Sequence, residues 1–362
     1  MIKTEAIRLA NHYTEPMLIT WDTGKRCNYD CSYCEASRHD NYSSFHSLTE
    51  YLDTFDFIKK YVSIYNKNKN EVPDHTNINF TGGEPTLNPN FWELADCIKQ
   101  DSSDFQLSLT TNGAWNRKYT EKIKQKFEGV TVSYHTESHA KLKDLVIENI
   151  LDLKNSNLRL QVNVMLHADY FDECVEVYEY LKANNISVKP RPIGDGNDTR
   201  KGWFKDQDGY FRKTTHDYSK EQIDWFFHET GLSKNSKCSA GDELGRGCCG
   251  GRCIEGLIDN DWQPISIVDT HFKDWYCSVN WYFLHIEQHT GLVYHHQTCQ
   301  AKFEAEKGPI GSLSDTQKIL NETENNLADK KIIVCPNNRC GCGMCAPKAK
   351  NKDVFMNLKD SI

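Results

Sequence analysis

Short apolar segments alternate with amphipathic helical patterns between residues 17 and 191. We expect strands at 17–21, 77–81, 106–110, 130–134, 158–166 and 186–193. The clearest helical pattern covers 139–154, where five apolar residues recur at helical spacing: Leu142, Leu145, Val146, Ile150 and Leu153. This alternation predicts an α/β fold in which parallel strands, joined by right-handed crossovers, curl into a partial (β/α)6 barrel or form an open sheet.

The pattern changes after residue 193. Segment 194–214 is rich in Gly and Asp and has no clear period, which is typical of a loop or a domain boundary. A short helix is expected at 220–230, where Ser219 and Gln222 have the spacing of a capping box. The stretch WYFLHIEQHTGLVYHH predicts a β-hairpin with Gly291 at its turn. We therefore expect three parts: an α/β core at 1–193, a linker with a short helix at 194–236, and a small cysteine-rich α+β domain at 237–362.

Composition narrows the class of protein. Hydrophobic residues make up 38% of the 362 residues and charged residues 26%, so a core can form. The net charge of −8 argues against broad attraction to nucleic acid or anionic membranes. The first residues, MIKTEAIRLANHYTEP, lack the apolar run of a signal peptide, and no stretch resembles a membrane span, so we expect a cytoplasmic protein. Fifteen cysteines in such a chain indicate metal or redox chemistry.

Three of these cysteines, Cys27, Cys31 and Cys34, lie in the stretch CNYDCSYC, directly after the first expected strand. In parallel sheets, ligands bind at the carboxyl ends of the strands, so this loop is placed for an active site. Three thiolates can hold three irons of a [4Fe–4S] cube and leave the fourth iron open to a small molecule. Zinc could use the same thiolates, completed by a distant histidine, although structural zinc normally has four ligands, often as two CxxC pairs.

Two further motifs follow the next two strands. The second strand leads into NFTGGEPTL, where Gly82 and Gly83 allow the backbone to approach a ligand closely. The third leads into SLTTNGAW, where Thr111 and Asn112 offer a hydroxyl and an amide that suit a ribose. Either motif alone would be an ordinary turn. Their order at successive strand ends favours a shared ligand site.

Together these motifs resemble those of radical S-adenosylmethionine (SAM) enzymes, over about the first 190 residues. The resemblance implies that SAM is the fourth ligand of the cluster, chelating the open iron through its amino and carboxylate groups. It implies that Gly82, Gly83 and Glu84 contact the methionine amine, and that Tyr33 lies beside the adenine. The implied chemistry is one-electron cleavage of SAM to a 5′-deoxyadenosyl radical, which abstracts a substrate hydrogen.

Other candidates lie at the ends of the fourth and sixth strands. Ser133 and Arg191 would bind the ribose and carboxylate of SAM, since the guanidinium fork suits a carboxylate, or they are solvated loop ends. His135 and Glu137 are expected near the site, and His135 is either a substrate contact or a hydrogen-bonded structural residue. Two isolated cysteines, Cys97 and Cys174, lie beside apolar helix faces, and we interpret both as buried core residues.

The cysteine-rich tail resembles the SPASM or twitch extensions of radical SAM enzymes, which carry auxiliary iron–sulfur clusters. Cys277 precedes the hairpin, Cys299 follows it, and CPNNRCGCGMC comes after a helical stretch, although the spacing departs from the family pattern. We expect at least one auxiliary [4Fe–4S] cluster held by Cys277, Cys299 and two of Cys335, Cys340, Cys342 and Cys345. A second cluster would use Cys238, Cys248, Cys249 and Cys253. A zinc knuckle is the alternative, and the nearby histidines His285, His289, His295 and His296 either suit zinc or alternate along exposed strands.

The resemblance therefore implies a radical SAM enzyme, and it favours a ribosomally made peptide or protein as the substrate. A small metabolite, sugar or nucleotide is the alternative substrate, and flavodoxin or ferredoxin would donate the electron. A competing hypothesis is a non-enzymatic zinc protein that binds nucleic acid or a protein partner. That hypothesis gives no reason for GGEP and TNG to lie beside the cysteine loop.

Overall fold

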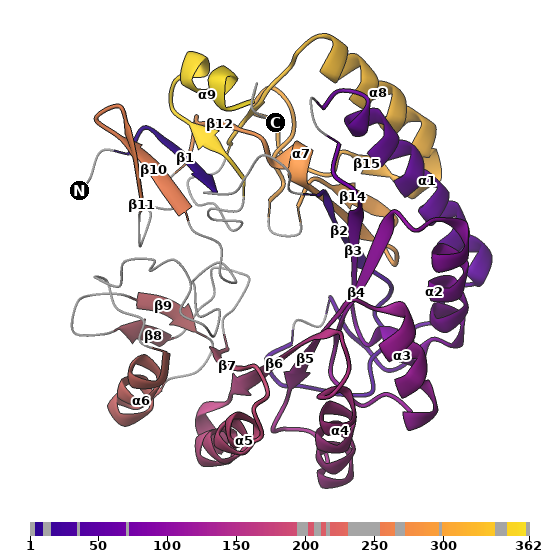
Figure 1. Ribbon diagram of the computed structural model, residues 1–362, viewed down its shortest axis with the longest axis vertical. Coiled ribbons are helices and arrows are strands. Elements are labelled where there is room, and N and C mark those ends of the chain that lie inside the picture. The colour runs from indigo at the N-terminus through magenta and orange to yellow at the C-terminus, as the bar shows by residue number, and fades with distance from the viewer. Residues whose placement is uncertain are drawn as a thin grey trace.

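The computed structural model describes residues 4–9, 16–34, 37–69, 72–193, 202–205, 211–214, 218–230, 254–264, 272–296, 299–336 and 346–359. Its main element is a nine-stranded sheet with the order β15-β14-β13-β2-β3-β4-β5-β6-β7 (Figure 1). The strands are β2 (Leu18–Asp22), β3 (Thr76–Thr81), β4 (Phe105–Thr111), β5 (Gly129–Tyr134), β6 (Arg159–Leu166), β7 (Val188–Pro192), β13 (Phe283–Glu287), β14 (Leu292–Tyr294) and β15 (Gly311–Ser312). Strands β2 to β7 are parallel and follow chain order, which confirms the expected α/β fold.

Helices cover one side of this sheet (Figure 1). They are α1 (Leu48–Asn66), α2 (Pro89–Asp101), α3 (Thr120–Lys126), α4 (Ala140–Leu153), α5 (Phe171–Ala183) and α8 (Thr316–Ala328). Helix α6 (Lys220–Thr230) begins at the predicted capping box, where Ser219 and Gln222 exchange hydrogen bonds at 3.0 and 3.3 Å. The short helices α7 (Val279–Tyr282) and α9 (Lys352–Lys359) lie in the C-terminal part. Within the described residues, no helix is long and apolar enough to cross a membrane.

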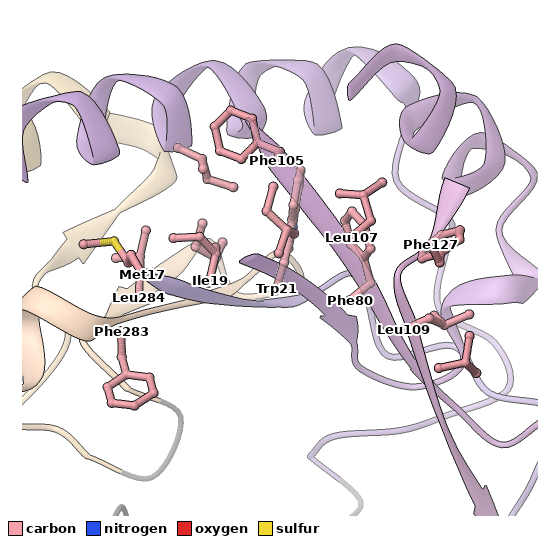
Figure 2. Packing of buried hydrophobic residues seen from close by; sticks show 14 of the residues in the cluster. Met17, Ile19, Trp21, Phe80, Phe105, Leu107, Leu109, Phe127, Phe283 and Leu284 are labelled. Atoms are coloured by element: carbon pink, nitrogen blue, oxygen red, sulfur yellow. The ribbon is translucent and has the colours of Figure 1, made fainter. Parts of the chain in front are cut away.

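The two faces of the parallel strands differ sharply in polarity. Strand positions that face the helices are apolar and buried: Ile19, Trp21, Ile78, Phe80, Leu107, Leu109, Val162 and Val164. Figure 2 shows five of them, Ile19, Trp21, Phe80, Leu107 and Leu109. The alternate positions are polar and half-buried: Thr20, Asn79, Ser108, Thr131, Ser133 and Asn163. Parallel strands that are buried on both faces are normally apolar throughout. The inner face of this sheet is therefore a polar surface that a ligand can reach.

The predicted hairpin is present, and it belongs to the main sheet. Strand β13 pairs antiparallel with β14, and Gly291 at the turn has a φ of +69°. β13 also pairs in parallel with β2, with Phe283 opposite Leu18 and Glu287 opposite Asp22. The sheet thus continues across the boundaries expected at residues 193 and 237, which themselves stay predictions.

A second sheet also joins distant parts of the chain, in the order β11-β10-β1-β17-β12-β16. Its strands are β1 (Ala6–Leu9), β10 (Ile254–Ile258), β11 (Asp261–Pro264), β12 (Tyr276–Cys277), β16 (Ile333–Val334) and β17 (Lys348–Ala349). A separate two-stranded ribbon consists of β8 (Gly202–Lys205) and β9 (Phe211–Thr214). Of the isolated cysteines, Cys174 is fully buried as expected, whereas Cys97 is half-buried.

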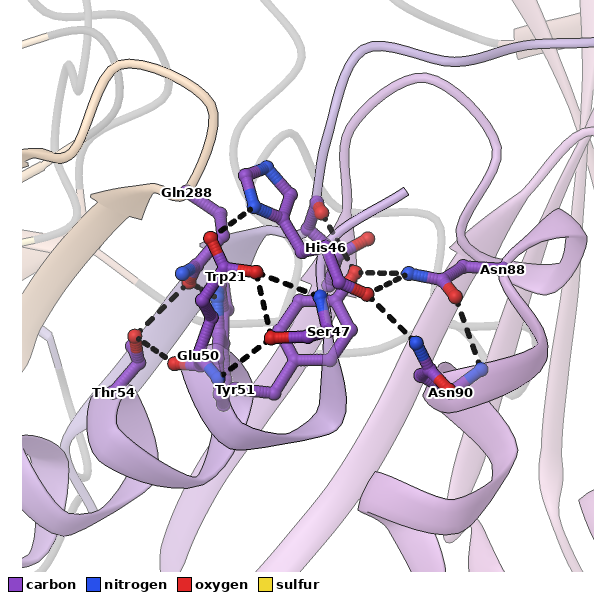
Figure 3. A network of polar contacts seen from close by, with 10 residues as sticks. Trp21, His46, Ser47, Glu50, Tyr51, Thr54, Asn88, Asn90 and Gln288 are labelled. Atoms are coloured by element: carbon purple, nitrogen blue, oxygen red, sulfur yellow. Dashed lines mark hydrogen bonds and ion pairs between the residues drawn. The ribbon is translucent and has the colours of Figure 1, made fainter. Parts of the chain in front are cut away.

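Polar contacts tie the hairpin to helix α1 (Figure 3). The Trp21 indole donates to the Gln288 side-chain oxygen at 2.9 Å, and the Thr54 hydroxyl donates to the same oxygen at 3.1 Å. Helix α1 begins at a capping box between Ser47 and Glu50. Since a buried amide oxygen left without donors is costly, these contacts fix the hairpin against the core.

Ile286 tests whether the hairpin is an integral part of the fold. This side chain is fully buried on β13. We expect Ile286→Ala to lower the free energy of unfolding by about 2–5 kcal/mol, as for other buried aliphatic truncations. Urea unfolding followed by circular dichroism measures it, with Glu324→Ala on the exposed face of α8 as control. A loss below about 1 kcal/mol would contradict the packing, because core truncations rarely cost so little.

Candidate active site

Three loops that follow β2, β3 and β4 line one cavity of about 350 Å³. The first loop carries the three cysteines, the second carries GGEP and the third carries TNG. Because these strands are adjacent and parallel, the three motifs meet at one edge of the sheet. The residues predicted for the site that line this cavity are Cys27, Cys31, Tyr33, Cys34, Gly82, Gly83, Thr111, Asn112 and Ser133.

The GGEP loop lies directly on the segment that leads into the cysteines. The Gly83 N–H donates to the Gly24 carbonyl at 2.7 Å, and the Glu84 N–H donates to the Arg26 carbonyl at 2.8 Å. A Cβ atom on Gly83 would lie 2.4 Å from the Arg26 carbonyl oxygen, and Gly82 has a φ of +115°. Both positions therefore require glycine. Besides exposing backbone to the cavity, the two glycines join the second loop to the first.

The Glu84 carboxylate joins the second loop to the third. It is buried and accepts hydrogen bonds from the Thr111 hydroxyl at 2.8 Å and from the Asn112 N–H at 2.7 Å. It also accepts from the Thr86 N–H at 3.1 Å. Burial raises the pKa of Glu84, and these hydrogen bonds oppose the shift. Protein donors already occupy the Glu84 carboxylate. The backbone of this loop would therefore make the contact with a bound molecule.

The three cysteine thiols differ in exposure. Cys31 is buried, Cys27 is half-buried and Cys34 is exposed, and the Cys34 N–H donates to the Cys31 carbonyl at 3.0 Å. The Asn112 amide nitrogen lies 3.9 Å from the Cys27 sulfur. Burial raises the pKa of Cys27 to about 11 and that of Cys31 to about 12. Both thiols are therefore protonated without metal, and a metal would have to displace those protons on binding.

The donor set fits an iron–sulfur cluster. Three thiols on one short loop border a cavity, and thiolates are the ligands of such clusters. Across the described part of the chain, no three Cys, His, Asp or Glu side chains surround a single ion position. Cluster binding would thus require the thiols to turn toward a common centre.

Residues after β5 hold the cysteine loop from the other side. The Ser32 N–H donates to Glu137 Oε2 at 2.9 Å, and Glu137 Oε1 lies 3.4 Å from His167 Nε2. The Tyr33 hydroxyl shares a hydrogen bond with His135 Nδ1, and the two rings stack with centroids 5.9 Å apart. Burial lowers the pKa of His135 to about 4, so its ring is neutral near pH 7. His135 therefore both lines the cavity and orients Tyr33.

Several cavity residues were missed by sequence reasoning, notably Asp22, Tyr29, Arg38 and His39. Burial raises the pKa of Asp22 to about 6. The alternation along the first strand could have identified Asp22 as the last inward position, but Arg38 and His39 follow no such pattern.

Arg191, in contrast, is exposed on β7 and donates to Asn163 Oδ1 at 3.4 Å. It is not among the described residues that line the cavity. Its role toward a carboxylate stays a prediction.

Only part of the expected auxiliary ligand set can be located. Cys277, Cys299 and Cys335 are all buried, and the Cys335 carbonyl accepts from the Asp274 N–H at 2.9 Å, beside β12. The remaining candidates lie outside the described residues: Cys340, Cys342, Cys345, Cys238, Cys248, Cys249 and Cys253. His285 and His295 are buried, so their explanation as exposed strand residues is wrong.

The hydrogen bond between Ser32 in the cysteine loop and Glu137 can be tested by substitution. In Glu137→Gln the side chain no longer offers two acceptor oxygens, so we expect the Ser32 amide to exchange hydrogen faster, by about 10-fold, with the global stability unchanged. Hydrogen–deuterium exchange measured by mass spectrometry on the peptide spanning 27–34 reads this out. Glu176→Gln, on the exposed face of α5, is the matched control. Equal exchange in the parent protein and in Glu137→Gln would refute the contact.

Comparison with known proteins gives the family of this segment. Residues 21–189 match the model of the radical SAM superfamily. Over 175 residues the chain is 25% identical to the GTP 3′,8-cyclase of Campylobacter jejuni, an alignment that covers 46% of this chain and 52% of that protein. It is 29% identical over 153 residues to the 7,8-dihydro-6-hydroxymethylpterin dimethyltransferase of Methanocaldococcus jannaschii, covering 38% of this chain and 28% of that protein. The chain thus spans about half the length of the GTP 3′,8-cyclase.

Solved structures are similar as well. Native anSMEcpe with bound AdoMet has a TM-score of 0.48 and 16% sequence identity, over 86% of this chain and 83% of that one. The matched segment 21–189 includes the three cysteines, GGEP and TNG. Residues 21–189 therefore form a radical SAM superfamily domain.

Proposed function

We propose that the protein is a radical SAM enzyme that cleaves SAM reductively and abstracts a hydrogen atom from a polar substrate. The observation that carries this proposal is the single cavity in which the cysteine loop, GGEP and TNG meet. The competing zinc-module hypothesis gives no reason for the bonds that join these loops through Glu84.

Cys27, Cys31 and Cys34 would hold the catalytic [4Fe–4S] cluster. When bound there, the cluster supplies the electron that breaks a carbon–sulfur bond of SAM and so produces the 5′-deoxyadenosyl radical. Cys31 is only 8% exposed, so little water reaches this residue. Such burial limits the access of water to a reactive intermediate.

SAM would lie along the edge formed by the second, third and fourth loops. The backbone of Gly82 and Gly83 faces the cavity and would receive the methionine end, beside the buried side chain of Glu84. Thr111 and Asn112 would face the nucleoside, and Asn112 is held by its N–H bond to Glu84. Tyr33, oriented by His135, would contact the adenine. Ser133 would contact the ribose, and Arg191 would require a movement of its side chain to reach a carboxylate.

The substrate would bind on the polar inner face of the sheet, which we propose curls into a partial barrel. Its hydroxyl and amide side chains offer hydrogen bonds to a peptide backbone, a sugar or a base. A ribosomally made peptide is the class that the family resemblance favours. A small nucleotide is the second candidate, because the chain is 25% identical to a GTP 3′,8-cyclase over 175 residues.

The C-terminal region would act as a twitch- or SPASM-like extension. Cys277, Cys299 and Cys335 are buried near the second sheet and the hairpin, and two of the last four cysteines would complete one auxiliary [4Fe–4S] cluster. Cys238, Cys248, Cys249 and Cys253 would serve a second cluster. A flavodoxin or ferredoxin would supply electrons in a cytoplasmic enzyme.

Cys31 provides the test of the catalytic cluster. We expect Cys31→Ala to abolish 5′-deoxyadenosine formation from SAM and dithionite while auxiliary iron is retained, because only the catalytic cube loses a ligand. Anaerobic chromatography of the nucleoside and iron analysis measure both quantities. Cys97→Ala, which removes a cysteine from helix α2 outside the cavity, is the matched control. Nucleoside formation by Cys31→Ala at the parent rate would end the proposal.

A further inference from the structure

Asp22 is a charged group of the cavity that the proposed chemistry does not use. It is the last residue of β2, and its side chain faces inward with Thr20 and lines the cavity beside the cysteines. It is 7% exposed, so nearly all of its surface is buried. Its contacts within the described residues are the Gly24 N–H, 3.3 Å from Oδ1, and His289 Nδ1, 3.8 Å from Oδ1. A carboxylate can accept about four hydrogen bonds, so Asp22 retains acceptor capacity toward the cavity.

The charged and titratable neighbours of Asp22 come from three elements. Glu287 lies opposite it on β13, and His285 is buried on the same strand, where its Nδ1 atom has no hydrogen-bond partner among the described residues. His289 approaches from the hairpin turn, and its pKa is lowered by burial. Arg38 belongs to the cysteine loop and lines the cavity. The described part of the chain thus places no cation within 4 Å of Asp22 other than a histidine that favours its neutral form.

Keeping a carboxylate at this position opposes folding. Burial raises the pKa of Asp22, so its ionised form is penalised in the folded protein near neutral pH. Asparagine would have nearly the same shape without that penalty. Buried polar groups that lower the stability of the fold and face a cavity are typical of binding sites.

A buried carboxylate with free acceptor capacity binds cationic hydrogen-bond donors best, because charge-assisted hydrogen bonds are strong where water is scarce. The same charge repels phosphate. We propose that Asp22 forms a subsite for an ammonium or guanidinium group of a molecule that enters the cavity. The inference deepens the proposed function and rests on it for the identity of SAM as one occupant. The cation is a basic group of the substrate, because the amino group of SAM would be an iron ligand and so would not be a free ammonium.

The subsite predicts a directional preference for the substrate. A peptide would direct a basic side chain or amino group toward the β2–β13 end of the cavity. A nucleotide would have its phosphates away from Asp22.

Binding measurements on the cluster-reconstituted full chain test the subsite. The variants are Asp22→Asn and Asp22→Ala, and Asp53→Asn on the exposed face of α1 removes the same charge as a control. The probes are SAM, 5′-methylthioadenosine, which lacks both the aminoacyl group and the sulfonium charge, Nα-acetyl-lysine methylamide and its uncharged norleucine analogue. Calorimetry at pH 8 under anaerobic conditions measures each affinity. Melting curves verify folding, and Asp22→Asn should melt no lower than the parent protein.

One result supports the subsite, and another overturns it. If both Asp22 variants bind SAM about 10-fold or more weakly but bind 5′-methylthioadenosine and the lysine probe normally, Asp22 acts on the sulfonium or aminoacyl end of SAM and the substrate subsite is overturned. If SAM affinity is retained and the lysine probe alone loses about 10-fold, the cation belongs to the substrate. Equal affinities of the parent and both variants for every cationic probe, or no binding of any cationic probe to the parent, would overturn the inference.

The proposed radical SAM activity can be refuted independently of the Asp22 subsite. A parent protein that neither binds SAM nor forms 5′-deoxyadenosine would refute the radical SAM activity. The comparison of the lysine and norleucine probes would still decide the role of Asp22.

Discussion

The architecture of the site depends on one buried carboxylate. Glu84 accepts hydrogen bonds from Thr111 and Asn112 in the next loop, while the N–H of Glu84 itself donates to Arg26 in the preceding one. A single residue therefore connects the cysteine loop, GGEP and TNG. Without the donors of the third loop the buried carboxylate would keep only its hydrogen bonds from Thr86, which is unfavourable. This cost links the folding of the three loops, so the cavity forms as a unit.

The second constraint is the alternation along the parallel strands. Apolar residues facing the helices supply the hydrophobic core, as with Phe80 packed on Phe91 at 5.2 Å between ring centroids. The opposite face is left polar, with residues such as Asn79 and Ser108 hydrogen-bonded to each other at 3.1 Å. The fold is therefore stabilised from one side and offers the other side to ligands. Stability and binding are carried by opposite faces of the same strands.

Much of this arrangement could be predicted from sequence, because local patterns determine it. The six strands, the hairpin around Gly291 and the capping box at Ser219 all follow from periodicity or short motifs. The pairing of β13 with β2 could not, because it joins segments more than 250 residues apart and no local pattern specifies a partner strand. The hydrogen bond from the Ser32 N–H to Glu137 could not be predicted either, because contacts between loops depend on the tertiary structure. The expectation that His285 lies on an exposed strand is wrong because β13 lies between β14 and β2, inside the main sheet.

The proposed radical SAM activity is tested most directly by the metal content and SAM chemistry of the parent protein, purified and reconstituted without oxygen. Iron and sulfide are determined, and the reduced protein is then incubated with SAM and analysed for 5′-deoxyadenosine. A radical SAM enzyme should contain at least about four irons per chain, as one cube requires, and should form the nucleoside. Bound zinc with no iron cluster and no 5′-deoxyadenosine would contradict the proposed activity.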